Sequence, residues 1–320
     1  MRVVILMPVR DDWPSAAELV RRIDQGVDSS QWKLEIVAVD DGSIQGCDPA
    51  AFASGFTAVR AIRVLRLRRN VGHQRAIAIG LVHVQQTGAG EGVVVMDADG
   101  EDTPEGLVDL LDAFAGSGGG EAFFAERIRR SESLSFQMFY HLYRFMHRGL
   151  TGISVRVGNF SILPPRYLET IVVLPELWNH YAAAVFRSRL PLGMIPIPRG
   201  KRIDGKSKMN FVALVTHGLS AVSVFGDTVG VRLLMGCLIG CLLAGLGIVG
   251  VATIRLFTGM AVPGWATYAV GILAVIMIQM LAIAASFTFY MLSSRANLGF
   301  MPLRDCPIFV AECLTVYNHE

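Results

Sequence analysis

A run of apolar residues leads directly into four carboxylates in the first third of the chain. Val93–Met96 are apolar, and within the next six positions come Asp97, Asp99, Glu101 and Asp102. The β-branched run predicts a buried strand, so the acids would lie where that strand ends and its loop begins. Ligands of open α/β sheets bind at the carboxyl ends of the strands. We therefore expect a binding site at this loop.

The chemistry of such a loop follows from its charge. Carboxylates this close repel one another unless a cation neutralises them, and hard oxygen ligands suit Mg²⁺ or Mn²⁺ shared with substrate phosphates. The loop thus predicts a metal-assisted site for a nucleoside diphosphate. The alternative is a solvated acidic turn ahead of a helix, because Thr103-Pro104-Glu105 is typical of a helix start.

Other predicted strands end in polar loops in the same way. Three predicted strands are the apolar runs at 2–7 and 34–39 and the run at 61–67, in which apolar residues alternate with Arg63 and Arg66 as in a half-exposed strand. They alternate with predicted helices at 15–23, 73–84 and 104–114. This alternation predicts a mostly parallel sheet covered by helices on both faces. The loops that follow the three runs carry Asp11 and Asp12, Asp40 and Asp41, and Asn70 to Gly72. Neither a G-x-G-x-x-G motif after the first strand nor a phosphate-binding P-loop motif is present, which disfavours those nucleotide-binding folds.

The C-terminal third of the 320-residue chain is different in composition. The hydrophobic fraction of 52% is concentrated after Val229, and two apolar stretches, about 231–257 and 265–292, each exceed the ~20 residues that cross a bilayer. Their short connection carries no cation while the flanks do, which predicts that both chain ends are cytoplasmic. The net charge of +2 indicates no nucleic-acid partner. Five cysteines without a Cys-x-x-Cys pair indicate reduced thiols.

Two cationic segments precede the apolar stretches. Residues 199–208 contain five cations in ten positions, which indicates a site for phosphate or anionic lipid, or a patch that only sets topology. Residues 134–150 mix aromatic and cationic side chains, as in a helix at a membrane interface or a core helix with one basic face.

Taken together, these motifs resemble the family 2 glycosyltransferases of GT-A fold, and among them the polyprenyl-phosphate glycosyltransferases. The motifs that match, in the family's order, are Pro8-Val-Arg-Asp11-Asp12, Val39-Asp40-Asp41-Gly42-Ser43, Asn70-Val-Gly72-His-Gln-Arg-Ala76, Asp97-Ala-Asp99-Gly-Glu101-Asp-Thr-Pro-Glu105 and Arg202-Ile-Asp-Gly-Lys-Ser-Lys208. Asp12 replaces the family's Glu, Glu101 replaces Gln, and Asn159 stands where relatives often have a small or acidic residue. No Q-x-x-R-W sequence is present, which argues against a processive synthase.

The resemblance implies an organisation for the whole chain. We expect a cytoplasmic GT-A catalytic domain over 1–210 with an interfacial helix at about 134–150, a juxtamembrane amphipathic segment over 211–228, two transmembrane helices over 229–293 and a cytoplasmic tail over 294–320. The expected activity is inverting transfer of a sugar from a UDP- or GDP-linked donor to a polyprenyl phosphate.

The resemblance also implies site residues. The nucleotide sugar would be held by Pro8, Val9, Asp12, Asp40, Asp41, Asn70, Asp97, Ala98 and Asp99. Mg²⁺ or Mn²⁺ would be held by Asp99 and Glu101. The acceptor phosphate would be held by Arg127, Arg130, Ser133, Arg202, Ser207 and Lys208. The residues expected to carry catalysis are Asp97, Asp99, Arg127 and Arg202.

Two other functions remain open at this point. A diacylglycerol or ceramide hydroxyl is an alternative acceptor, although it would need a general base and Asn159 is a poor one. A degenerate, non-catalytic nucleotide-binding membrane scaffold is the alternative from another class. The glycine-lined apolar stretches are also compatible with a homo-oligomer.

Overall fold

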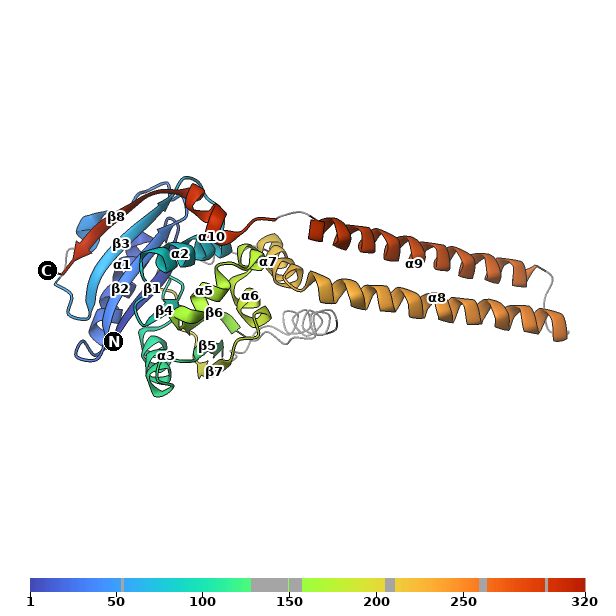
Figure 1. Ribbon diagram of the computed structural model, residues 1–320, viewed down its shortest axis with the longest axis horizontal. Coiled ribbons are helices and arrows are strands. Elements are labelled where there is room, and N and C mark those ends of the chain that lie inside the picture. Colours follow the sequence, from blue (N-terminus) through green and yellow to red (C-terminus); the bar gives the residue numbers. More distant parts are fainter. Residues whose placement is uncertain are drawn as a thin grey trace. The chain divides into compact units, whose positions relative to one another are not determined.

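The computed structural model describes residues 1–52, 55–127, 149, 157–204, 211–258, 264–296 and 299–319 (Figure 1). The chain divides into two compact units. The first comprises Met1–Phe136, Val155–Val224 and Phe300–Glu320, and the second comprises Gln137–Ser154 and Phe225–Gly299. The expected interfacial helix at 134–150 lies outside the described residues, apart from residue 149.

Within the described part of the first unit, eight strands form one mixed sheet in the order β7-β5-β6-β4-β1-β2-β3-β8 (Figure 1). The strands are β1 (Arg2–Val9), β2 (Lys33–Asp40), β3 (Val59–Leu67), β4 (Gly92–Val95), β5 (Ala122–Arg127), β6 (Val157–Leu163), β7 (Leu192–Ile197) and β8 (Val310–Asn318). The four strands β3, β2, β1 and β4 are parallel, as the apolar runs predicted. Their carboxyl ends therefore meet at one edge of the sheet.

The remaining strands bring further chain segments to the same edge. β6 is antiparallel to β4 and β5, and β7 is parallel to β5. The start of β6 and the end of β7 consequently lie at the edge where β4 ends. Ser161 pairs with Val95, so Asn159 lies near the level of Asp97, and the segment after Ile197 reaches the acidic loop.

Helices cover both faces of the sheet, and each face has its own apolar core (Figure 1). Alternate residues of β1 point to opposite cores: Val3 and Ile5 pack with α1 and α3, while Val4 and Leu6 pack with α2. Gly80 lets α2 approach closely, because a Cβ there would collide with Leu6 and Val39. The helices of this unit are α1 (Trp13–Gly26), α2 (His73–Thr87), α3 (Pro104–Gly116), α5 (Pro165–Ile171), α6 (Tyr181–Arg187), α7 (Phe211–Ser223) and α10 (Pro302–Asp305), with short 3₁₀ turns at Pro49–Phe52, Pro175–Trp178 and Cys306–Phe309.

The C-terminal segment differs from the expected tail. β8 pairs antiparallel with β3, from Leu67 opposite Val310 to Ala61 opposite Asn318. The Arg66 guanidinium also donates to Glu312 Oε1 (3.0 Å). Residues assigned to a tail over 294–320 thus supply the edge strand of the sheet, because β3 offers an unpaired edge that another strand can complete.

The second unit consists mainly of two long helices, α8 (Gly226–Phe257) and α9 (Trp265–Ala296). By length and composition, Gly226–Phe257 and Trp265–Ser293 can each cross a membrane, as the sequence predicted. Large apolar side chains such as Leu242, Leu246 and Ile278 are more than half exposed, which suits a lipid surround.

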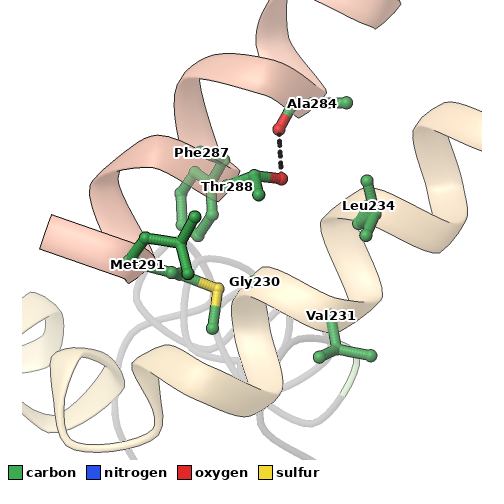
Figure 2. Close-up of a pocket in the computed structure, with 8 residues that line it drawn as sticks. Gly230, Val231, Leu234, Ala284, Phe287, Thr288 and Met291 are labelled. Carbon is green, nitrogen blue, oxygen red and sulfur yellow. Dashed lines mark hydrogen bonds between the residues drawn. The ribbon is translucent and has the colours of Figure 1, made fainter. Parts of the chain in front are cut away.

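Small residues bring the two helices together. Figure 2 shows Gly230 of α8 facing Phe287 and Met291 of α9, and a Cβ at Gly230 would collide with the Met291 sulfur. Gly240 faces Met280 in the same way. Close approach at small residues is how membrane helices gain packing contacts, since lipid removes the hydrophobic driving force between them.

Candidate active site

The acidic loop after β4 folds into a turn in which its own carboxylates accept main-chain hydrogen bonds. The Asp97 main-chain N–H donates to Asp102 Oδ2 (2.9 Å), and the Glu101 N–H donates to Asp99 Oδ1 (2.9 Å). Gly100 has φ +84°, a conformation that favours glycine. Thr103 Oγ1 accepts from the Gly106 N–H (3.1 Å) and so caps α3, which confirms the predicted helix start.

A second segment, residues 199–203, lies directly on this loop; we call it the arginine segment. The Gly200 N–H donates to the Glu101 carbonyl (2.8 Å), and the Ile203 N–H donates to the Asp99 carbonyl (2.9 Å). A Cβ at Gly200 would lie 2.5 Å from the Gly100 carbonyl oxygen, so glycine is required for this approach. The parallel pairing of β7 with β5 is what delivers the segment to this edge.

Two guanidinium groups of the arginine segment pair with the acidic loop. Arg202 donates to Asp99 Oδ2 from Nε (3.0 Å) and from Nη2 (2.6 Å), and Arg199 pairs with Glu101. The Asp99 side chain is only 12% exposed and that of Arg202 25%, so solvent screens this pair less than a surface pair. Burial lowers the pKa of Arg202, but the carboxylates of Asp99, Glu101 and Asp12 outweigh it, and the net pKa is raised.

Asp41 holds the loop after β3 in place. Its Oδ1 accepts from the Val71 N–H (2.7 Å), and its Oδ2 accepts from the Gly72 N–H (3.0 Å) and from Asn70 Nδ2 (2.9 Å). The side chain is buried, and this burial raises the pKa of Asp41 although the two N–H groups favour the ionised form. Asp41 and Asn70 are therefore hydrogen-bonded to each other. The bond from the Gly72 N–H to Asp41 also fixes the start of α2.

The carboxylates after β1 and β2 also have partners in their own loops. Asp40 Oδ1 accepts from the Ser43 N–H (2.8 Å), and Asp12 Oδ1 accepts from the Ser15 hydroxyl (2.6 Å). Asp11, which has φ +49°, accepts from the Ile44 N–H (2.6 Å). The first two bonds are local, whereas the Asp11 bond links the loop after β1 to the loop after β2 beside the acidic loop.

His73, the first residue of α2, contacts the acidic loop through a polar network. Its Nε2 lies 3.2 Å from Asp97 Oδ1 and 3.0 Å from Asn159 Nδ2. Asn159 Oδ1 accepts from Gln74 Nε2 (3.1 Å), and Gln74 Oε1 accepts from the Tyr181 N–H (2.7 Å). A main-chain N–H can only donate, so it fixes the orientation of both buried amides and directs the Asn159 amide nitrogen at the imidazole.

His73 therefore has two competing partners, and the hydrogen on Nε2 selects between them. Nε2 without a hydrogen accepts from Asn159, whereas Nε2–H, which the imidazolium always carries, donates to Asp97. Partial burial lowers the pKa of His73, but the charges of Asp97, Asp102 and Asp41 outweigh that effect, and the net pKa is raised.

We expect Asp97→Asn to lower the pKa of His73, because the largest charge that favours the imidazolium is removed. Since the folded pKa is raised, the stabilisation from this pair is complete below the ordinary value of about 6.5 and is lost as pH rises through the folded pKa. NMR titration of ¹³C-labelled histidine in the detergent-solubilised chain measures the shift. His83, ten residues further along α2, is the internal reference, because its pKa is lowered by burial and by Arg63. An unmoved His73 resonance would refute the contact.

The structure brings several of the predicted site residues to one edge and leaves others undescribed. Gathered there are Asp12, Asp40, Asp41, Asn70, Asp97, Ala98, Asp99, Glu101 and Arg202, with Pro8 and Val9 at the end of β1. Arg127 ends β5, while Arg130, Ser133, Ser207 and Lys208 lie outside the described residues. Two contacts at this edge were not predicted from the sequence, that of His73 with Asp97 and that of Arg199 with Glu101.

The carboxylate oxygens of Asp99 and Glu101 are the kind of ligand that a hard divalent cation prefers. Among the described residues, no three His, Cys, Asp or Glu side chains converge as a preformed metal cage. Two carboxylates suffice for Mg²⁺ or Mn²⁺ when substrate phosphates and water supply the other ligands. The two guanidinium groups already neutralise these carboxylates, which shows that the loop takes positive charge.

Comparison with known proteins identifies the family of this chain. The family model described as glycosyl transferase family 2 matches residues 4–168, slightly more than half of the chain. The protein belongs to glycosyl transferase family 2. The matched region runs from β1 to α5 and includes the acidic loop, and the expected GT-A fold is confirmed.

Relatives and solved structures resemble this family 2 protein over most of its length. An uncharacterised glycosyltransferase YkcC of Bacillus subtilis is 24% identical over 82% of this chain and 80% of its own. The undecaprenyl-phosphate 4-deoxy-4-formamido-L-arabinose transferase of Edwardsiella ictaluri is 26% identical over 71% of this chain and 72% of its own. Among solved structures, glucosyl-3-phosphoglycerate synthase of Mycobacterium tuberculosis, in complex with Mn²⁺, UDP and phosphoglyceric acid, has a TM-score of 0.49 and 13% identity, covering 72% of this chain and 78% of its own.

Proposed function

We propose that this glycosyltransferase moves a sugar from a nucleoside-diphosphate sugar to the phosphate of a membrane polyprenyl phosphate. The observation that carries the proposal is the meeting of the acidic loop, residues 97–102, with the arginine segment at one edge of the sheet. Such a site offers carboxylates for a cation-bound diphosphate and guanidinium groups for a second anion. Two helices able to cross a bilayer, and relatives named for undecaprenyl-phosphate substrates, support the lipid acceptor.

The reaction needs little proton transfer with this acceptor. A phosphate monoester has a second pKa of about 6 and is largely dianionic at neutral pH. One of its oxygens forms a bond to the anomeric carbon, while the bond from that carbon to the diphosphate oxygen breaks. The electron pair of the broken bond leaves with the nucleoside diphosphate, and attack from the opposite face inverts the anomeric configuration.

The residues of the site hold the two anionic substrates in line, which is a positioning task. In this proposal Asp97 contacts the donor sugar, and the loops at Pro8–Asp12, Asp40 and Asn70 surround the nucleoside. A cation held by Asp99 and Glu101 would stabilise charge that develops on the leaving diphosphate. Arg202 and Arg127, with Arg130, Ser133, Ser207 and Lys208, would bind the acceptor phosphate.

The chain path supports a membrane hairpin with the catalytic unit on one side. The first unit contains residues both before α8 and after α9, and β8 is part of its sheet. If α8 and α9 each cross once, the chain returns to the side it left. The connection between α8 and α9 carries no cation while the flanks of the two helices do, which favours a cytoplasmic location for the catalytic unit.

Mass spectrometry of lipid products tests the proposal. The full-length protein in undecaprenyl-phosphate vesicles is incubated with Mn²⁺ and, separately, with UDP-glucose, a UDP-aminosugar and GDP-mannose. We expect one donor to give a polyprenyl-phosphate-linked sugar of inverted anomeric configuration. Parallel vesicles with diacylglycerol or ceramide test the hydroxyl acceptors. A product only in those vesicles would reject the phosphate acceptor, and nucleotide binding without product from any donor would favour the scaffold alternative.

A further inference from the structure

Each carboxylate assigned to the cation already has a guanidinium partner. Asp99 Oδ2 accepts hydrogen bonds from two N–H groups of Arg202, and the Glu101 carboxylate forms an ion pair with Arg199. A divalent cation would need these same carboxylate oxygens, and a guanidinium and a metal ion cannot share one carboxylate edge without repelling each other. Cation and arginines are therefore in competition.

The competition is built into the backbone and is not limited to flexible side chains. The main-chain bonds from Gly200 to Glu101 and from Ile203 to Asp99 hold the arginine segment in register with the acidic loop. Ile203 also packs over Gly100, where an added Cβ would meet its Cγ1 at 2.6 Å. The register places the two arginines against the two carboxylates at once.

We propose that Arg199 and Arg202 occupy the place of the divalent cation in the empty enzyme, and that the cation-bound donor enters by displacing them. The inference rests on the proposed function and adds an order of events. The donor releases two guanidinium groups at the edge where the second anion must bind. The acceptor phosphate then binds to these two guanidinium groups, which were paired with Asp99 and Glu101 before the donor bound. Arg199, which the sequence analysis did not assign, becomes a positioning residue for that second anion.

The coupling has a thermodynamic consequence. Binding of Mn²⁺ includes the cost of breaking the two ion pairs, so the free enzyme binds the cation more weakly than its carboxylates alone would. Removing one guanidinium removes part of this cost. Because hydrogen bonds to charged groups are the stronger class, we expect each removal to tighten Mn²⁺ binding by about tenfold.

Titration of Mn²⁺ alone, followed by the EPR signal of the free ion, tests this in the full-length protein in detergent. Arg199→Gln and Arg202→Gln are each compared with Lys201→Gln. Lys201 is exposed on the same segment and makes no ion pair with any described residue. All three variants lose one positive charge, but only the first two lose a competitor for a carboxylate. Arg199 is 43% exposed, so its variant tests the proposal even where Arg202→Gln folds poorly.

We expect about tenfold tighter Mn²⁺ binding in both arginine variants and less than about twofold in Lys201→Gln. Equal tightening in all three variants would reduce the effect to net charge and overturn the displacement. Unchanged or weaker binding in the arginine variants would overturn it as well, while sugar transfer by the wild type would leave the proposed function standing. Absence of Mn²⁺ binding in every protein, together with absence of lipid product, would reject both.

Discussion

Replacing Asp99 with asparagine is expected to reduce sugar transfer by about 10²–10³-fold, the loss seen when one electrostatic stabiliser of a transition state is removed. Asp99 accepts hydrogen bonds from Nε and Nη2 of Arg202 and is one of the two carboxylates proposed to hold a cation. Asparagine keeps the oxygen that accepts from the Glu101 N–H, so the loop can retain its turn. Initial rates of lipid-product formation in vesicles measure the effect.

The matched control is Asp112→Asn, which removes one carboxylate from an exposed position on α3. The control should retain the wild-type rate, and both variants should keep the wild-type melting temperature within a few degrees. Full activity in Asp99→Asn would remove this residue from the catalytic machinery.

Asp41→Ala is expected to destabilise the first unit by about 2–4 kcal/mol, because it leaves buried donors without a partner. The carboxylate accepts from the Val71 and Gly72 N–H groups and from the Asn70 amide, and its side chain is buried. Thermal unfolding of the full chain in detergent should show a melting temperature lower by several degrees.

The exposed Asp48 provides the comparison, since its carboxylate accepts only from the Ala50 main-chain N–H among the described residues. Asp48→Ala should lower the free energy of unfolding by less than about 1 kcal/mol, so its melting temperature should stay close to that of the wild type. If Asp41→Ala melts like the wild type, the carboxylate does not hold the 70–72 loop, and a direct nucleotide role for Asp41 becomes the better explanation.

Local patterns predicted the parallel half of the sheet and the acidic loop. β1, β2 and β4 are short, mostly apolar runs, and β3 alternates apolar residues with Arg63 and Arg66. All four have clear ends, so the positions of their loops follow from the sequence. Because parallel strands point the same way, the gathering of those loops at one edge also follows. The two long helices were predicted from the length and apolar composition of their segments.

Features that depend on long-range pairing could not be read in the same way. β8 is mostly exposed and follows two apolar helices, so no local pattern indicates its pairing with β3. The contact of His73 with Asn159 requires that β6 run antiparallel beside β4. The arginine segment was recognised as cationic, but its pairing with Asp99 and Glu101 depends on β7 running parallel to β5.

The most direct test of this site is an experimental structure of the full chain with a nucleoside diphosphate and Mn²⁺, with the metal located by its anomalous signal. We predict the metal at the carboxylates of Asp99 and Glu101, the diphosphate beside it, and the guanidinium groups of Arg199 and Arg202 turned away from those carboxylates. A nucleotide bound elsewhere, or a metal that leaves both arginine pairs intact, would contradict the account.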